Sequence, residues 1–214
     1  MGDNQSQKAG EGSTLIQAGG NVSIELGVSY AELDRRIDEL RRDIAREIVS
    51  KAQEMLREAG VQPVPAPLKT LVPLLQYASL EEDRGIQERW AALLANTATT
   101  GATTVSLAFI EILRQLSPEE ARLLDAFFGW QSDFMLSGRN LSSADALNWQ
   151  KANWHLLDSP HLAIYLEDLL RHRLIDVEPG IINSDEPLQA AYILTRFGFE
   201  FVLACRPPKR GEGE

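Results

Sequence analysis

Residues 67–101 read PLKTLVPLLQYASLEEDRGIQERWAALLANTATTG, and residues 105–125 read VSLAFIEILRQLSPEEARLLD. The apolar residues of both stretches recur every three or four positions, which is the spacing of one face of an α-helix. Trp90 begins one such face, and we expect it to lie in a helical core rather than in a cofactor site. The implied helices cover residues 67–78, 80–98, 104–116, 118–130, 143–157 and 160–173.

Serine residues mark the starts of three of these helices. Ser79 with Glu82 and Ser117 with Glu120 fit the Ser-x-x-Glu capping box, in which each side chain accepts a hydrogen bond from a backbone N–H of the other residue. A proline follows Ser117 and another follows Ser159, and proline is favoured in a first helical turn because its missing N–H has no partner there. These signals predict a mainly α-helical domain.

Two segments of this region, WAALLAN (residues 90–96) and FIEILRQLS (residues 109–117), resemble the Abi-alpha family of bacterial proteins associated with abortive infection. The resemblance covers roughly residues 65–205. It implies a biological setting, which is defence against phage. It implies no reaction and no site residues that can be assigned to positions of this chain.

The first 29 residues follow a different pattern. Glycines fall at positions 2, 10, 19 and 27, and each intervening segment combines turn residues with a polar or alternating stretch. Val22, Ile24 and Leu26 alternate with polar residues, which is typical of a half-buried strand. Two interpretations remain open: a β-repeat that stacks on copies in neighbouring subunits, or a disordered polar leader containing one hairpin.

A long helix is predicted after this leader. Ser29 with Glu32 is a further capping box, and Gly60 followed by prolines predicts the end, so the helix covers residues 30–60. Its apolar stripe consists of Leu33, Ile37, Leu40, Ile44, Ile48, Ala52 and Met55. We expect ion pairs between Asp38 and Arg42 and between Glu47 and Lys51. The stripe either packs on its own domain or pairs with copies of itself.

The C-terminal region changes from helical to alternating spacing. A helix ending near Leu174 is followed by strands at residues 175–177 and 190–194, and Thr195 is placed to cap a last helix over residues 196–205. Helix, two-stranded wing and helix is the layout of a winged-helix unit. The expected organisation is a leader (1–29), a long helix (30–60), a proline-rich linker (61–67), a helical domain (68–158), a winged-helix-like unit (159–206) and a tail (207–214).

Charge argues against DNA as the partner of this unit. From Ser159 to Arg206 there are seven acidic residues against four arginines, and the whole chain has a formal net charge of −10. Acidic surfaces repel phosphate backbones, so Arg171, Arg173 and Arg196 are the only cations placed to help. A protein-binding or purely structural role is favoured, and nucleic acid is not expected to bind.

No catalytic, cofactor or metal site is predicted. The histidines, His155, His161 and His172, are too few and too widely spaced for a metal cluster with one cysteine. Cys205 falls on an apolar helix face, which favours a small core residue over a nucleophile. Asn96 follows an apolar stretch near the end of a predicted helix, so a capping role or a buried hydrogen bond is favoured over a catalytic role. The acids at 81–83 suit a first helical turn.

Length and composition complete the expectation. The chain has 214 residues, of which 44% are hydrophobic and 24% charged, with no long apolar run and a single cysteine, all typical of a cytoplasmic globular protein. We expect a non-enzymatic interaction or sensor component of anti-phage defence that forms a homo-oligomer through residues 1–58 and binds a phage or host protein. The alternatives are a winged-helix regulator that binds nucleic acid and an enzyme with an unrecognised site.

Overall fold

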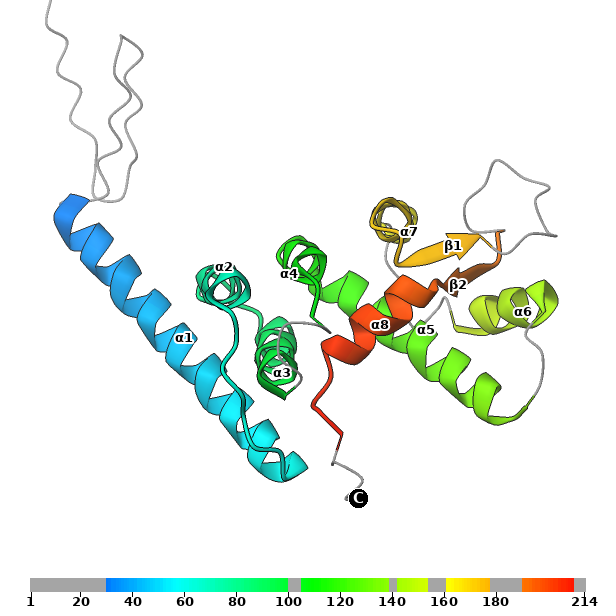
Figure 1. Ribbon diagram of the computed structural model, residues 1–214. Coiled ribbons are helices and arrows are strands. Elements are labelled where there is room, and N and C mark those ends of the chain that lie inside the picture. Colours follow the sequence, from blue (N-terminus) through cyan, green and yellow to red (C-terminus); the bar gives the residue numbers. More distant parts are fainter. Residues whose placement is uncertain (1–29, 100–104, 139–141, 154–160, 178–189, 210–214) are drawn as a thin grey trace, which may run out of the picture. The chain divides into compact units, whose positions relative to one another are not determined.

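The computed structural model describes residues 30–99, 105–138, 142–153, 161–177 and 190–209 (Figure 1). The described helices are α1 (Tyr30–Ala59), α2 (Leu68–Ala78), α3 (Arg84–Thr99), α4 (Leu107–Leu113), α5 (Pro118–Leu136), α6 (Ser143–Asn153), α7 (Leu162–Arg171) and α8 (Arg196–Ala204). Two strands, β1 (Ile175–Val177) and β2 (Tyr192–Leu194), pair antiparallel. The prediction of a mainly α fold with a small hairpin is therefore confirmed, while the predicted leader lies outside the described residues.

The chain consists of two units, residues 1–42 and residues 43–214, and α1 crosses their boundary as one helix. In the second unit, Ile48, Ala52 and Leu56 of α1 are buried in the hydrophobic core. Ile37 and Leu40, nearer the start of the helix, are 45% and 55% exposed. The C-terminal part of the apolar stripe thus packs on its own domain.

The end of α1 has the geometry that the glycine predicts. Gly60 has a φ of +69°, in the left-handed region that favours glycine. The N–H of Val61 donates to the carbonyl of Leu56 at 3.0 Å, and the N–H of Gly60 donates to that of Arg57 at 3.1 Å. These two bonds form a Schellman motif, which satisfies carbonyls that the helix end leaves unpaired.

The two predicted ion pairs of α1 have different outcomes. Lys51 lies 3.2 Å from the carboxylate of Glu47, as predicted. The pairing of Asp38 with Arg42 is corrected, because the guanidinium of Arg42 donates to the backbone carbonyl of Asp38 at 3.0 Å. The predicted cap at Ser29 lies outside the described residues.

The predicted start of a helix at residue 80 is wrong. Ser79 ends α2 instead, and its hydroxyl donates to the carbonyl of Gln76 at 2.8 Å. α3 begins at Arg84, where the carboxylate of Asp83 accepts from the N–H of Ile86 at 2.9 Å. An aspartate side chain therefore caps α3, because it reaches the N–H groups of the first turn directly.

The other helix starts agree more closely with prediction. Ser117 and Glu120 form the predicted capping box at α5, with proline in the first turn. α5 runs six residues beyond its predicted end at 130, whereas α4 and α7 are shorter than predicted. Ser106 caps α4, and Ser142 exchanges hydrogen bonds with Asp145 at the start of α6, a capping box that the prediction missed. Ser159 lies outside the described residues.

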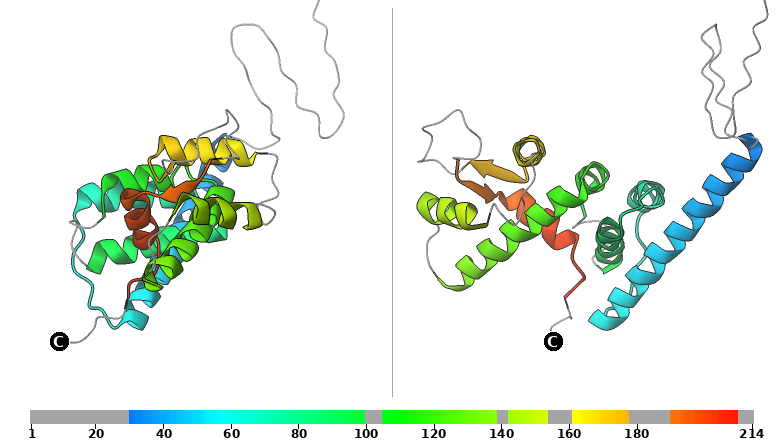
Figure 2. Two further views of the ribbon diagram at one scale, coloured as in Figure 1. Left: turned by 90° about the vertical axis from the view of Figure 1, so that its right-hand side faces the viewer. Right: turned by 180° about the vertical axis from the view of Figure 1, so that it is seen from behind.

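α8 lies in the middle of the second unit, between α3 and the hairpin (Figure 1), and the same order is seen from behind in Figure 2. Trp90 is 1% exposed, and Phe127 and Phe201 are fully buried. The ring of Phe109 packs edge-on against that of Phe201, with 5.6 Å between centroids. The prediction that Trp90 is a core residue is confirmed, and its buried Nε1 has no hydrogen-bond partner among the described residues.

The hairpin is tied to the helices by two glutamines. The N–H of Leu194 donates to the side-chain oxygen of Gln131 on α5 at 2.5 Å, and Gln150 on α6 donates to the carbonyl of Tyr192 at 2.6 Å. Both backbone groups belong to β2, whose other neighbour is β1. The glutamine side chains satisfy backbone groups on β2 that would otherwise need a third strand or water.

The start of α8 is held closely against the turn after α7. Thr195 caps α8 by accepting from the N–H of Gly198 at 2.8 Å, as predicted, and its own N–H donates to the carbonyl of Leu174 at 3.0 Å. A Cβ atom at Gly198 would lie 1.9 Å from that carbonyl oxygen. The order α7, β1, β2 and α8 matches the predicted layout, and the assignment as a winged helix stays a prediction.

Candidate interaction sites

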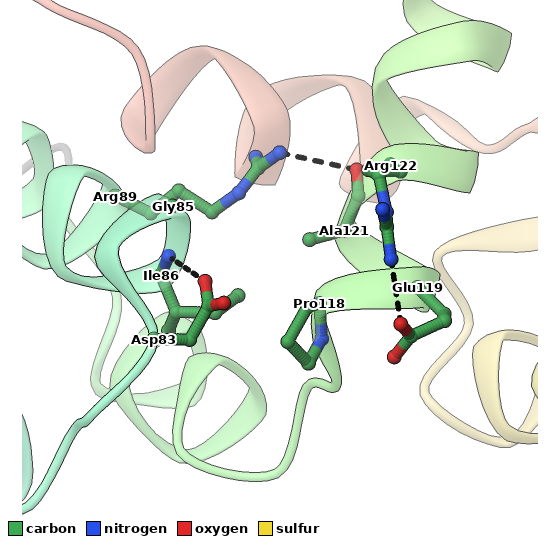
Figure 3. A pocket seen from close by; sticks show the side chains of 8 residues that line it. All are labelled: Asp83, Gly85, Ile86, Arg89, Pro118, Glu119, Ala121 and Arg122. Carbon is green, nitrogen blue, oxygen red and sulfur yellow. Dashed lines mark hydrogen bonds and ion pairs between the residues drawn. The ribbon is translucent and has the colours of Figure 1, made fainter.

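A small cleft lies beside the N-terminal ends of α3 and α5 (Figure 3). Its volume is about 350 Å³. Its lining residues are Asp83, Gly85, Ile86, Arg89, Pro118, Glu119, Ala121 and Arg122. The described lining contains two acids and two arginines, so its formal charge balances.

Each charged side chain of the cleft already has a protein partner. Arg89 donates to the carbonyl of Ala121 at 3.1 Å, and Arg122 lies 2.5 Å from the carboxylate of Glu119 (Figure 3). The carboxylate of Asp83 caps α3, as described above. Among the described lining residues there is no serine, cysteine or histidine. Binding a small polar group there would require exchange of existing contacts, and the described lining offers no nucleophile with an adjacent base.

Asp125 joins three helices beside this cleft. Its carboxylate pairs with Arg89 of α3 and, at 3.3 Å, with Arg206 just after α8. The guanidinium of Arg206 also lies 4.1 Å from the centroid of the Phe128 ring. Because the side chain of Arg89 is only 11% exposed, this cluster serves to hold α3, α5 and the end of α8 together.

Asn96 strengthens the same junction. Its amide donates to the carbonyls of Ala204 and Arg206 at 2.9 and 2.8 Å, so it caps the C-terminal end of α8. The predicted role, a cap or a buried hydrogen bond, is confirmed. The capped helix lies more than one hundred residues away in the chain, and no local signal in the sequence indicates that partner.

The arginines of the C-terminal unit are only partly available to a nucleic acid. Arg171 lies 2.6 Å from the carboxylate of Asp168, and Arg206 is held by Asp125. Arg173 and Arg196 are exposed. Arg173 has a φ of +57°, and its carbonyl accepts a hydrogen bond from the Thr195 hydroxyl at 2.6 Å. Two exposed arginines on an acidic protein make a weak phosphate-binding surface.

The residues with reactive side chains lie apart from the cleft lining. Cys205 is 4% exposed, as predicted for a core residue, and burial raises the pKa of its thiol to about 12. His161 and His172 flank α7 at its two ends, and His155 lies outside the described residues. In the described ranges, no three His, Cys, Asp or Glu side chains are grouped as metal ligands.

The exposed apolar residues of α1 form a further candidate surface. Ile37 and Leu40 lie one turn apart on a helix face that is otherwise strongly charged. Arg35 pairs with Glu32 and Glu39 on the same helix, at 2.9 and 2.7 Å. None of the described helices combines the length and apolar character that crossing a membrane requires. Ile37 and Leu40 are thus the candidate surface of α1 for contact with another protein.

Comparison with known proteins adds one finding to this geometry. Residues 32–205 match the model of the family described as abortive infection alpha. The match starts two residues into α1 and ends at Cys205, so it contains nearly all of α1, the cleft lining and α7, β1, β2 and α8. No curated protein and no solved structure is significantly similar to this chain.

Proposed function

Because the chain belongs to the abortive infection alpha family, we propose that it is a non-enzymatic interaction or sensor component of anti-phage defence. It acts in the cytoplasm through self-association and through a phage or host protein. The observation that carries this proposal is the exposed pair Ile37 and Leu40 on a helix of 30 residues. Exposed apolar residues on a preformed helix suit association with another protein.

The division of α1 supports a role in association. The part from Ile48 to Ala59 is anchored in the core, whereas the preceding apolar residues Ile37 and Leu40 are exposed. Single exposed apolar residues are ordinary on protein surfaces. Here the two continue, at helical spacing, the same stripe that packs on the core farther along. A helix that is anchored at one end and has exposed apolar residues at the other is typical of one that meets a second surface.

The contacts inside the second unit support a non-enzymatic role. Each charged group of the cleft has a structural contact: Asp83 caps α3, Arg122 pairs with Glu119, and Arg89 binds the carbonyl of Ala121, which accounts for them without a reaction. The thiol of Cys205 is buried, and its raised pKa keeps it protonated at neutral pH, so it is a poor nucleophile.

A phage challenge combined with a mass measurement tests the proposal. We expect cells that express the full chain to form fewer plaques, and the purified chain to have a mass above that of a monomer by light scattering. Unchanged plaque numbers would refute the defence role, and a monomer at all concentrations would refute self-association. If Arg122→Ala abolished protection without changing the mass or the fold, the cleft would be implicated and an enzyme would become the better interpretation.

A regulator that binds DNA is the second candidate. The observation that favours it is the order α7, β1, β2 and α8, with Arg173 and Arg196 exposed. The acids Glu167, Asp176 and Glu200 are exposed on the same unit and oppose binding. A sequence-selective complex with duplex DNA at nanomolar concentration would establish this function in place of the first.

A further inference from the structure

Ile37 and Leu40 occupy core positions of a short heptad pattern. Together with Leu33 and Ile44, which precede and follow them in the sequence, they are spaced by four, three and four residues. In a coiled coil this spacing puts Ile37 and Ile44 at position a, and Leu33 and Leu40 at position d. Ile44 already packs partly against the core of the second unit, so Ile37 and Leu40 are the exposed part of the seam.

Each side of the seam has one acidic and one basic residue, and their order along the helix is opposite on the two sides. With 3.6 residues per turn, Asp34 and Arg41 fall on one side, and Arg36 and Asp43 fall on the other. Each side therefore begins with one sign of charge and ends, two turns later, with the opposite sign. Reversing the direction of such a helix exchanges the signs, so an antiparallel copy of the helix is complementary to it.

We propose that a second copy of this chain packs antiparallel on this seam, with Ile37 opposite Leu40 of the second copy. This rests on the proposed self-association and names its surface. In this arrangement each flank faces the same flank of the second copy, so Asp34 approaches Arg41 and Arg36 approaches Asp43 across the interface. A parallel pair brings Arg36 towards Arg41 of the other copy through its g and e positions, and those like charges repel.

The cost of forming this contact is low for two reasons. α1 is already helical, because its C-terminal part is buried in the core, so pairing does not have to nucleate the helix. Two of the flanking residues are held by solvent-exposed pairs within α1, Arg36 with Glu32 at 2.8 Å and Asp43 with Arg46 at 2.6 Å. Exposed pairs of this kind are weak and exchange readily.

The apolar seam is tested on the full chain by sedimentation velocity over a range of concentrations. We expect the double substitution Ile37→Ser with Leu40→Ser to raise the dissociation constant of the oligomer at least tenfold. Both side chains are about half exposed, so the domain should remain folded, which circular dichroism checks. Glu39→Ser changes a polar residue on the opposite side of α1 and is the matched control, for which we expect no change.

The direction of pairing is tested by exchanging charges. Arg36→Glu puts two acids, at positions 36 and 43, together at both contacts of the flank that contains them, so we expect weaker association. Adding Asp43→Arg should restore association, with the signs exchanged. In a parallel pair this sequence of loss and recovery does not arise, because Arg36 and Asp43 are not partners there. If the single substitution fails to weaken association, or the second fails to restore it, the antiparallel arrangement is refuted.

The outcomes also separate this inference from the function on which it rests. A full chain that stays monomeric refutes both self-association and this seam. An oligomer that is unaffected by Ile37→Ser with Leu40→Ser refutes the seam alone and leaves self-association through another surface. Weakening by the seam substitutions, together with loss and recovery in the charge exchange, supports both.

Discussion

Replacing Gly198 by alanine places a methyl group where the backbone of another element already lies. The new Cβ would be 1.9 Å from the carbonyl oxygen of Leu174 and 2.7 Å from its carbonyl carbon. Real Cβ atoms essentially never come within 3.0 Å of other heavy atoms, so the backbone must separate by about 1 Å. Neither contact atom belongs to a flexible side chain that could turn aside. The strain must therefore be relieved by moving α8 away from the turn after α7.

The expected cost follows from the contacts that this movement breaks. The Leu174 carbonyl accepts from the N–H of Thr195 at 3.0 Å and from its hydroxyl at 3.3 Å, and losing such bonds costs about 1–2 kcal/mol. Overpacking adds about 1–3 kcal/mol, and the better helix propensity of alanine returns about 1 kcal/mol. We expect Gly198→Ala to lower the free energy of unfolding by about 1–4 kcal/mol, and Tm by about 2–16 °C.

Gly129→Ala is the matched control, since Gly129 lies inside α5, is exposed, and would place its Cβ with no atom within 4 Å. We expect this variant to gain about 0.5–1 kcal/mol from helix propensity. Urea denaturation followed by circular dichroism measures both variants. If Gly198→Ala were as stable as the parent chain while Gly129→Ala behaved as expected, the close approach of α8 to Leu174 would be refuted.

Four further predictions concern the core, the leader, the C-terminal unit and the thiol. Trp90→Ala should cost about 3–5 kcal/mol in urea denaturation, because Trp90 is 1% exposed, and a near-normal midpoint would contradict its core position. Deleting residues 1–28 should lower the mass measured by light scattering while the helical signal persists, and an unchanged mass would exclude the leader from assembly. Duplex DNA should bind with a Kd of about 10⁻⁴ M or weaker at physiological salt, and if binding is nanomolar, Arg171→Ala and Arg173→Ala should reduce it. Cys205 should react with a thiol reagent at pH 8 much more slowly in the folded chain than in urea, and equal rates would show that it is accessible. Burial raises the pKa of the Cys205 thiol from 9.0 to about 12. Between these two values the unfolded chain loses the thiol proton and the folded chain keeps it, so the free energy of unfolding should fall as the pH rises above about 9. Below pH 9 this thiol should cause no pH dependence of stability.

The helix boundaries show where sequence patterns succeed and where they fail. The helix start at Ser117 and the helix end at Gly60 are predicted correctly, because a capping box and a left-handed glycine act on backbone groups within a few residues. Ser79 satisfies the same pattern, yet α3 begins at Arg84, because Asp83 also offers an oxygen to the first turn and Ser79 closes α2 instead. Where two local signals compete, packing of the adjoining helices decides between them.

The sequence by itself determined the helical class, the apolar faces around Trp90, the caps at Ser117 and Thr195, and the acidic surface, because each depends on near neighbours or on composition. Only the tertiary structure decided which distant groups meet. Gln131 binds a strand 63 residues away, and Asn96 caps a helix 108 residues away. A polar side chain can satisfy any exposed backbone group within reach, so its partner depends on how the helices pack. The same holds for Gly198. Glycine is required there because the backbone of Leu174 lies too close to allow a Cβ atom, and the residues next to Gly198 in the sequence do not indicate this contact.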